Sequence, residues 1–215
     1  MRVILTRHYK TQSNEAGRIV GWGDSPPCAD WKLNVDFIEQ RLRENNIAPD
    51  AIYSSDLRRS LLTAQIYAES FAVTDVFSDA ALKEINYGEV QTRQKSWVFE
   101  HYPQHKQDPD MVYPGGESFR QMQRRSVDFF NLLAKQHAQQ TILVVSHAGV
   151  IRGVVSHFLD LDYAGSLRHG IPFRYIGDFH FEGTSCRRYD EIGKPSGFVR
   201  NAVIDIPYAN SVIAS

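Results

Sequence analysis

Short apolar runs alternate along this chain with longer segments in which apolar residues recur every three or four positions. The runs at 2–6, 51–55 and 141–147 are rich in β-branched residues and end in polar ones, which is typical of strands buried on both faces. A weaker run of the same kind occupies 73–77. We therefore predict four strands of a largely buried sheet.

Amphipathic helical patterns follow these runs. One begins near Asp30, and Asp56 is a candidate N-cap for a second. Ser118 and Gln121 form a capping-box pair at the start of a long helix. A further helix begins within two residues of the end of the 141–147 run.

Alternating strands and helices predict an α/β fold, namely a three-layer α/β/α sandwich with a mainly parallel central sheet. Residues 85–116 interrupt the alternation with a polar, proline-punctuated excursion, which we expect to hold one short helix near 96–102 and to cover the site. The region 163–215 contains the runs "FRYIGDFHF", "SCRRYDE" and "FVRNAVIDI", which predict a closing hairpin. Without repeats or linkers, 1–215 is expected to be a single domain.

Composition narrows the possible partners. The chain has 215 residues and a formal net charge of −1, which argues against nucleic acid as the main partner. No secretory signal is visible, and the apolar runs are too short to span a bilayer. Two cysteines suit a reducing compartment. We expect a soluble, cytoplasmic protein that binds neither nucleic acid nor membrane.

Two predicted strands end in residues that can bind an anion or act as nucleophiles. The first ends in Arg7-His8 and the run at 141–147 ends in His147, which precedes a helix. Ligands of open α/β sheets bind at the carboxyl ends of strands, and a helix N-terminus there favours an anion. The second strand leads into Arg58-Arg59, of which only one can point into the site. Histidine and arginine side chains are therefore expected to converge on a phosphate.

Six motifs, in order, carry a family resemblance. They are Arg7-His8-x-x-Thr11-x-x-Asn14, "GRIVGWGDSP", "SSDLRRSLLTA", "LKEINYGE", "GGES" and "VVSHAGVIR". Together they resemble branch 1 of the histidine phosphatase superfamily, the phosphoglycerate mutase-like group. The resemblance covers about residues 1–152 and implies a phosphoglycerate mutase-like fold.

The resemblance also implies roles for particular residues. His8 matches the nucleophile that becomes a phosphohistidine, and Glu84 matches the proton donor. An attacking imidazole must be neutral with a free Nε2, so a backbone carbonyl should hold its Nδ1–H. The scheme implies no metal and no cofactor. The remaining matches form the phosphate pocket: Arg7, Asn14, Arg59, His147 and Ala148.

The chain departs from the family pattern at Tyr9, where glycine is usual. We interpret Tyr9 as part of the pocket wall on an ordinary backbone, and we expect Gly21 and Trp22 to lie near the substrate as well. The six histidines other than His8 and His147 are interpreted as surface or structural. Arg168 and His169 are interpreted as surface rather than as a family-specific substrate contact.

The leading functional hypothesis is a metal-independent phosphatase of a small phosphorylated metabolite. One alternative is a cofactor-dependent phosphoglycerate mutase, which the length of the chain disfavours. A third, from another class, is a non-catalytic module that binds a phosphate ligand. The substrate and the oligomeric state stay open, although pairing of edge strands would give a homodimer.

Overall fold

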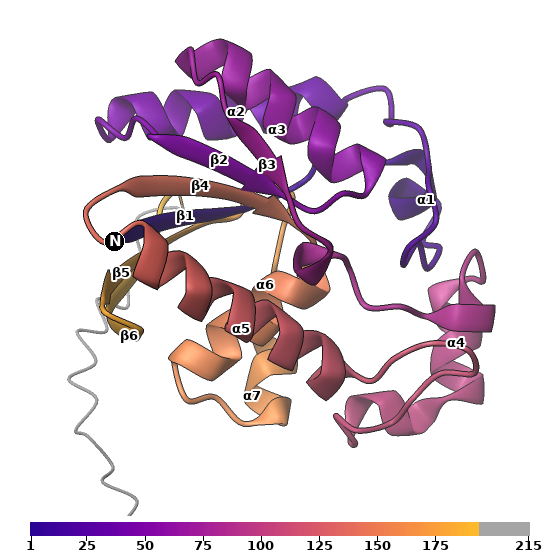
Figure 1. The fold of residues 1–215 in the computed structure, drawn as a ribbon. Coiled ribbons are helices and arrows are strands. Elements are labelled where there is room, and N and C mark those ends of the chain that lie inside the picture. The colour runs from indigo at the N-terminus through magenta and orange to yellow at the C-terminus, as the bar shows by residue number, and fades with distance from the viewer. Residues whose placement is uncertain (194–215) are drawn as a thin grey trace, which may run out of the picture.

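A computed structural model describes residues 1–193, in which six strands form one sheet in the order β3-β2-β4-β1-β5-β6 (Figure 1). The strands are β1 (Arg2–Arg7), β2 (Ala51–Ser54), β3 (Val76–Ser78), β4 (Thr141–Ser146), β5 (Ile176–Glu182) and β6 (Ser185–Glu191). The first four pair in parallel, and β5 and β6 add an antiparallel hairpin beside β1. The mainly parallel sheet is as predicted.

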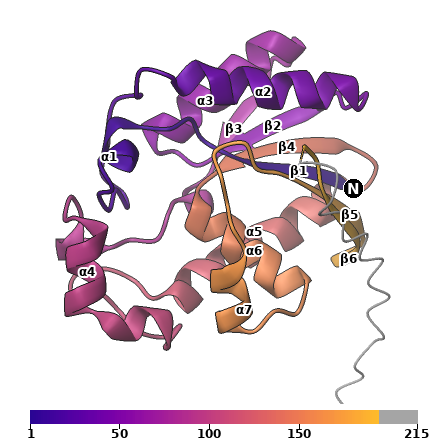
Figure 2. The ribbon, with the colours of Figure 1, turned by 180° about the vertical axis from the view of Figure 1, so that it is seen from behind.

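Helices cover both faces of this sheet (Figures 1 and 2). On one face lie α2 (Trp31–Glu44) and α3 (Arg58–Phe71); on the other lie α5 (Phe119–Gln136), α6 (Ala148–Phe158) and the short α7 (Tyr163–Arg168). Because alternate strand residues face opposite ways, Val3 and Leu5 enter one core and Ile4 the other. None of the helices in residues 1–193 is long and apolar enough to cross a bilayer.

The excursion after β3 lies at the end of the molecule where α1 (Gln12–Glu15) is found (Figure 1). It contains α4 (Lys95–His101), which confirms the short helix predicted near 96–102. Three 3₁₀ helices accompany it: η1 (Ala80–Leu82), η2 (Gly88–Val90) and η3 (Pro103–Lys106). A small separate apolar cluster holds this segment together; its buried members are Ile19, Val90, Val98 and Tyr113.

Several element boundaries test the sequence predictions. The Ser118–Gln121 capping box is present at the start of α5, and α2 begins just after Asp30. The predicted N-cap at Asp56 is wrong, because Leu57 holds that position and the Asp56 carboxylate pairs with Lys83 at 3.1 Å instead.

β3 begins three residues later than the strand predicted at 73–77, since it spans Val76–Ser78. The hairpin in the 163–215 region is present as β5 and β6, whereas the run "FVRNAVIDI" lies outside the described residues.

Candidate active site

The carboxyl ends of β1 and β4 are adjacent, with Arg7 paired to Ser146 in the parallel register. From these two neighbouring strands the chain leaves toward β2 on one side and toward β5 on the other, which makes their ends the switch point of the sheet. His8 and His147 follow the two strands, and their ring centroids lie 4.9 Å apart. Both side chains are buried.

His8 is held as one defined tautomer. Its Nδ1 lies 2.5 Å from the carbonyl oxygen of Tyr9, and its Nε2 lies 3.2 Å from Nε of Arg59. An arginine N–H can only donate, so Nε2 is the acceptor and Nδ1 carries the proton. Burial, together with the charges of Arg59 and Arg7, holds the pKa of His8 well below its ordinary value. The imidazole is therefore neutral, and Nε2 has the lone pair that attack on phosphorus requires.

Arg59 is buried and Arg58 is exposed, so one of the two adjacent arginines enters the site, as predicted. Nη1 and Nη2 of Arg59 donate to the carbonyl oxygens of Gly23 (2.8 Å) and Gly21 (2.7 Å). Burial lowers the pKa of this guanidinium. The loop that contains Gly21 thereby fixes Arg59 against His8.

Arg7 is held by the segment that precedes β5. Its Nη1 donates to the carbonyl oxygen of Ile171 at 2.8 Å, and its Cζ lies 3.7 Å from the centroid of the Phe173 ring. Burial lowers the pKa of Arg7 to about 10, so the group stays charged at neutral pH. Its Nε is buried without a hydrogen-bond partner in residues 1–193, which leaves a donor available to a ligand.

His147 is fully buried, and neither ring nitrogen has a hydrogen-bond partner among the described residues. Burial and the nearby Arg59 hold its pKa well below the ordinary value, so its ring is neutral with one N–H donor. A buried polar group without a partner is unfavourable in a protein interior. Its position beside His8 indicates that a ligand supplies the missing partner.

Glu84 lies at the N-terminus of α6. Its Oε1 and Oε2 accept from the backbone N–H of Gly149 at 3.1 and 3.3 Å, and Oε1 also accepts from that of Ile85 at 3.0 Å. The close approach needs glycine, because a Cβ at position 149 would lie 2.2 Å from Oε1. The half-buried carboxyl thus has a fixed place at the site.

Asn14 and Thr11 form a capping box at the start of α1. The Oδ1 of Asn14 accepts from the Thr11 backbone N–H (3.2 Å) and hydroxyl (2.9 Å). No acceptor within residues 1–193 engages the amide nitrogen, which can therefore donate to a ligand. Asn14 and Ala148 both line a cavity of about 300 Å³. Other predicted residues that line it are Arg7, His8, Gly21, Arg59 and Glu84.

The interpretation of Tyr9 as pocket wall is wrong. Its ring is 4% exposed and packs against Trp31 in the core beneath α2, because consecutive residues of an extended chain point to opposite faces and His8 takes the inner one. Tyr9 is not among the described residues with positive φ, so the predicted ordinary backbone is confirmed. The backbone carbonyl of Tyr9, rather than its ring, belongs to the site, because it accepts the hydrogen bond from Nδ1 of His8.

Trp22 does not line the cavity either. Its indole is 41% exposed, and Nε1 donates to the backbone carbonyl of Glu84 at 2.6 Å. The Trp22 ring also lies 4.7 Å from the Lys83 ammonium. Trp22 therefore links the loop that fixes Arg59 to the segment that carries Glu84. It positions residues of the site and does not itself line the cavity.

Several residues that line the cavity were not predicted. They include Arg18, Tyr87, Lys95, His105 and Arg152. Arg152 stands inside the motif "VVSHAGVIR", which could have signalled it. His105, which is predicted to be surface or structural, lines the cavity. His169, which is predicted to lie at the surface, has a side chain only 16% exposed that pairs with Glu191 at 3.1 Å.

Comparison with known proteins agrees with this geometry. The sequence model of the histidine phosphatase superfamily (branch 1) matches residues 3–187. The chain belongs to this family. A metal-independent phosphoserine phosphatase of Arabidopsis thaliana is 33% identical over 171 residues, which are 77% of this chain and 71% of that protein. Phosphoserine phosphatase 1 of Hydrogenobacter thermophilus is 30% identical over 187 residues, which are 85% of this chain and 87% of that protein.

A solved structure matches as well. Phosphoserine phosphatase from Entamoeba histolytica in complex with 3-phosphoglyceric acid has a TM-score of 0.77 at 22% identity, covering 91% of this chain and 98% of that one. This likeness confirms the predicted phosphoglycerate mutase-like fold. The family and the relatives confirm the predicted class of reaction, the hydrolysis of a phosphoric monoester.

Proposed function

We propose that His8 attacks the phosphorus of a small phosphorylated metabolite and that water then hydrolyses the resulting phosphohistidine. The observation that carries this proposal is the tautomer of His8, whose Nδ1 lies 2.5 Å from a carbonyl oxygen and whose Nε2 accepts from Arg59. When a phosphate enters, the Nε–H of Arg59 turns to a phosphate oxygen and releases the Nε2 lone pair for attack.

The phosphoryl oxygens are stabilised by fixed donors that surround His8. Arg7 and Arg59 supply the charge, and His147 and Asn14 supply neutral N–H groups. Prearranged donors of this kind stabilise the transition state more than water does, since they need no reorganisation as charge develops. The N-terminus of α6 at Ala148 adds a favourable field for an anion.

Glu84 serves as the proton donor to the leaving alkoxide. As the phosphohistidine forms, the P–O bond to the alcohol breaks and the carboxyl proton moves to that oxygen. The resulting carboxylate then takes a proton from the attacking water, which restores His8 and releases inorganic phosphate. The backbone N–H groups of Gly149 and Ile85 hold the carboxylate in place for both steps.

The charges of the cavity favour a substrate with more than one anionic group. Five cationic side chains line it against the single carboxylate of Glu84. Of these cations, Arg18, Lys95 and Arg152 stand outside the phosphate donors named above. We therefore propose a phosphorylated carboxylic acid, and phosphoserine is the first candidate because two relatives are named for it.

The test is release of inorganic phosphate from phosphoserine and from an aryl phosphate in the presence of a chelator. His8→Ala should abolish release, and a labelled phosphoenzyme that is stable in base and labile in acid should form only with the unsubstituted chain. Undiminished turnover by His8→Ala would refute the assignment of the nucleophile. Interconversion of phosphoglycerates with a bisphosphate primer, instead of phosphate release, would indicate a mutase.

Failure of phosphoenzyme to form with any phosphomonoester would indicate the non-catalytic binding module instead. The covering role of residues 85–116, the cytoplasmic location and the homodimer stay predictions.

A further inference from the structure

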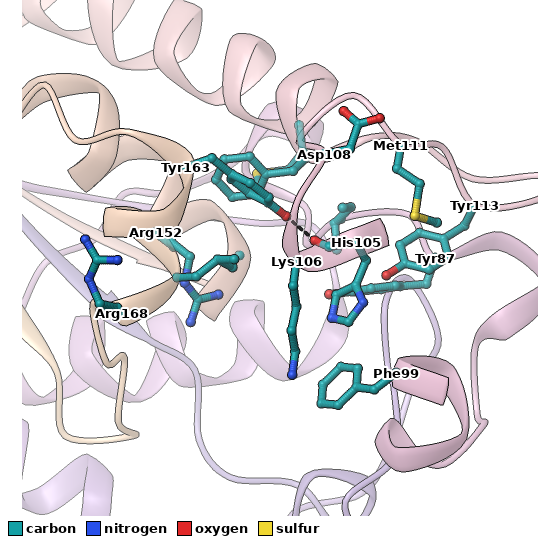
Figure 3. A pocket seen from close by; sticks show the side chains of 15 residues that line it. Tyr87, Phe99, His105, Lys106, Asp108, Met111, Tyr113, Arg152, Tyr163 and Arg168 are labelled. Atoms are coloured by element: carbon teal, nitrogen blue, oxygen red, sulfur yellow. Dashed lines mark hydrogen bonds between the residues drawn. The ribbon is translucent and has the colours of Figure 1, made fainter. Parts of the chain in front are cut away.

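A second cavity, of about 430 Å³, adjoins the one that contains His8 (Figure 3). We call it the outer chamber. The two cavities share six lining residues, Tyr87, Phe99, His105, Tyr113, Gly149 and Arg152. None of the side chains proposed to bind or transfer the phosphoryl group lines the outer chamber. Ile85 and Gly149, which line it, take part in the chemistry only through their backbone N–H groups.

The outer chamber carries an excess of positive charge. Lys106, Arg152 and Arg168 line it, against the single carboxylate of Asp108. The Nε of Arg152 donates to a backbone carbonyl, that of Ser166, at 3.1 Å. No hydrogen bond or ion pair engages the Arg168 guanidinium or the Lys106 ammonium within residues 1–193. In Figure 3 Arg152 and Arg168 lie on one side and Lys106 reaches in from η3.

The walls between these cations are aromatic. Phe99, Phe119 and Tyr163 line the chamber, and the hydroxyl of Tyr163 donates to the backbone carbonyl of His105 (Figure 3). This hydrogen bond joins α7 to η3 across the chamber. His105 is further stacked on Phe99, with ring centroids 4.6 Å apart. The chamber is therefore a shaped space with apolar walls and not merely a gap between elements.

We infer that the outer chamber binds the distal part of the leaving alcohol: the substrate class is a phosphomonoester with an extended apolar or aromatic stem that ends in a second anion. This inference rests on the proposed function. A carboxylate or phosphate is the group that a free guanidinium recognises best. The stem between the two anions would pack against the aromatic side chains that line the chamber. A compact ester such as phosphoserine fills the inner cavity alone.

The experiment compares two series of phosphomonoesters of increasing stem length, one ending in a carboxylate and the other in a methyl group. Above a threshold stem length, kcat/KM for the phosphomonoester that ends in a carboxylate should exceed kcat/KM for the one that ends in a methyl group about ten-fold. A factor of this size corresponds to one hydrogen bond to a charged group. A third series, ending in a second phosphate, tells which anion the chamber prefers.

Arg168→Gln should bring the carboxylate-to-methyl ratio close to one at every length. Arg124→Gln is the matched control, because Arg124 is exposed on α5 and lines neither cavity. It should leave the ratio unchanged. Equal thermal unfolding midpoints of the two variants would show that both are folded.

A ratio near one at all lengths, or a ratio that Arg168→Gln leaves intact, would overturn the inference. Either result is distinct from failure of the proposed function, in which no ester of any length, phosphoserine and the aryl phosphate included, releases phosphate.

Discussion

Gly149 is the second residue of α6. Its backbone N–H donates to the Glu84 carboxylate, and its lack of a side chain leaves room for that carboxylate. A Cβ at this position would lie 2.2 Å from Oε1 and 3.2 Å from Cδ of the carboxyl group. The backbone of the helix is rigid and the end of a glutamate side chain is not, so Gly149→Ala should move the carboxyl group and leave the fold intact.

The magnitude follows from two opposing terms. Alanine stabilises a helix relative to glycine by up to about 1 kcal/mol, whereas loss of the hydrogen bond from Gly149 to the Glu84 carboxylate costs about 1.5–3 kcal/mol. The free energy of unfolding should therefore fall by about 0.5–2 kcal/mol. A displaced proton donor, in contrast, lowers kcat by a factor on the order of 100 or more.

The assay uses two substrates with different leaving groups. An alkyl phosphate leaves as a strongly basic alkoxide that needs the proton from Glu84, whereas a nitrophenyl phosphate leaves as a weakly basic phenolate. Gly149→Ala should therefore lower kcat/KM, which reports formation of the phosphohistidine, much more for phosphoserine than for the aryl ester. Urea unfolding of the same variant gives the stability term.

Gly153→Ala is the matched control on the same helix. A Cβ there meets its nearest neighbours, atoms of Gln123 and Met122, at 3.4 Å, which is van der Waals contact. It should keep full activity. The reasoning is refuted if Gly149→Ala retains kcat/KM for phosphoserine, or if kcat/KM falls by the same factor for both substrates, which would indicate a defect in phosphate binding.

Two further predictions concern other groups of the site. The pKa values of His8 and His147 lie well below that of a histidine in the unfolded chain, about 6.5. Below that pH the unfolded chain binds protons that the folded chain does not, so the free energy of unfolding should fall by up to about 1.4 kcal/mol per pH unit for each histidine. Urea unfolding at stepwise lower pH should show a shallower fall for His147→Gln, and equal slopes would contradict this. Phe173→Leu removes the ring above Arg7 and should weaken inhibition by inorganic phosphate about 2- to 10-fold; an unchanged inhibition constant would mean that the ring does not position Arg7.

The sequence alone was informative wherever function depends on which residue ends a strand. Arg7, His8 and His147 follow buried apolar runs, and parallel strands bring their carboxyl ends to one edge whatever the details of packing. The choice of Arg59 over Arg58 rested on the resemblance and on the divergence of adjacent helix residues, and the burial of the two side chains agrees with it.

The side-chain direction of Tyr9 could not be obtained this way. The two-residue period of an extended chain predicts that the side chains of Tyr9 and His8 face opposite sides of the sheet. Which of these sides faces the cavity depends on the helices that cover each face. The Tyr9 side chain lies in the core beneath α2, and only its backbone carbonyl contributes to the site. The position of its loop likewise predicts that Trp22 lies near the substrate, although its indole N–H donates to the backbone carbonyl of Glu84.

Tertiary structure alone decided what surrounds the phosphate site. Arg168 is exposed, as predicted, but the chamber that it lines could not be read from the sequence. His105 and His169 stand in segments without a regular apolar period, so their burial and contacts depend on how the excursion after β3 and the segment before β5 fold back over the sheet. Local sequence determined the strands, their terminal residues and hence the chemistry. Long-range packing determined the cavity walls, because contacts between residues far apart in the chain leave no periodic mark in the sequence.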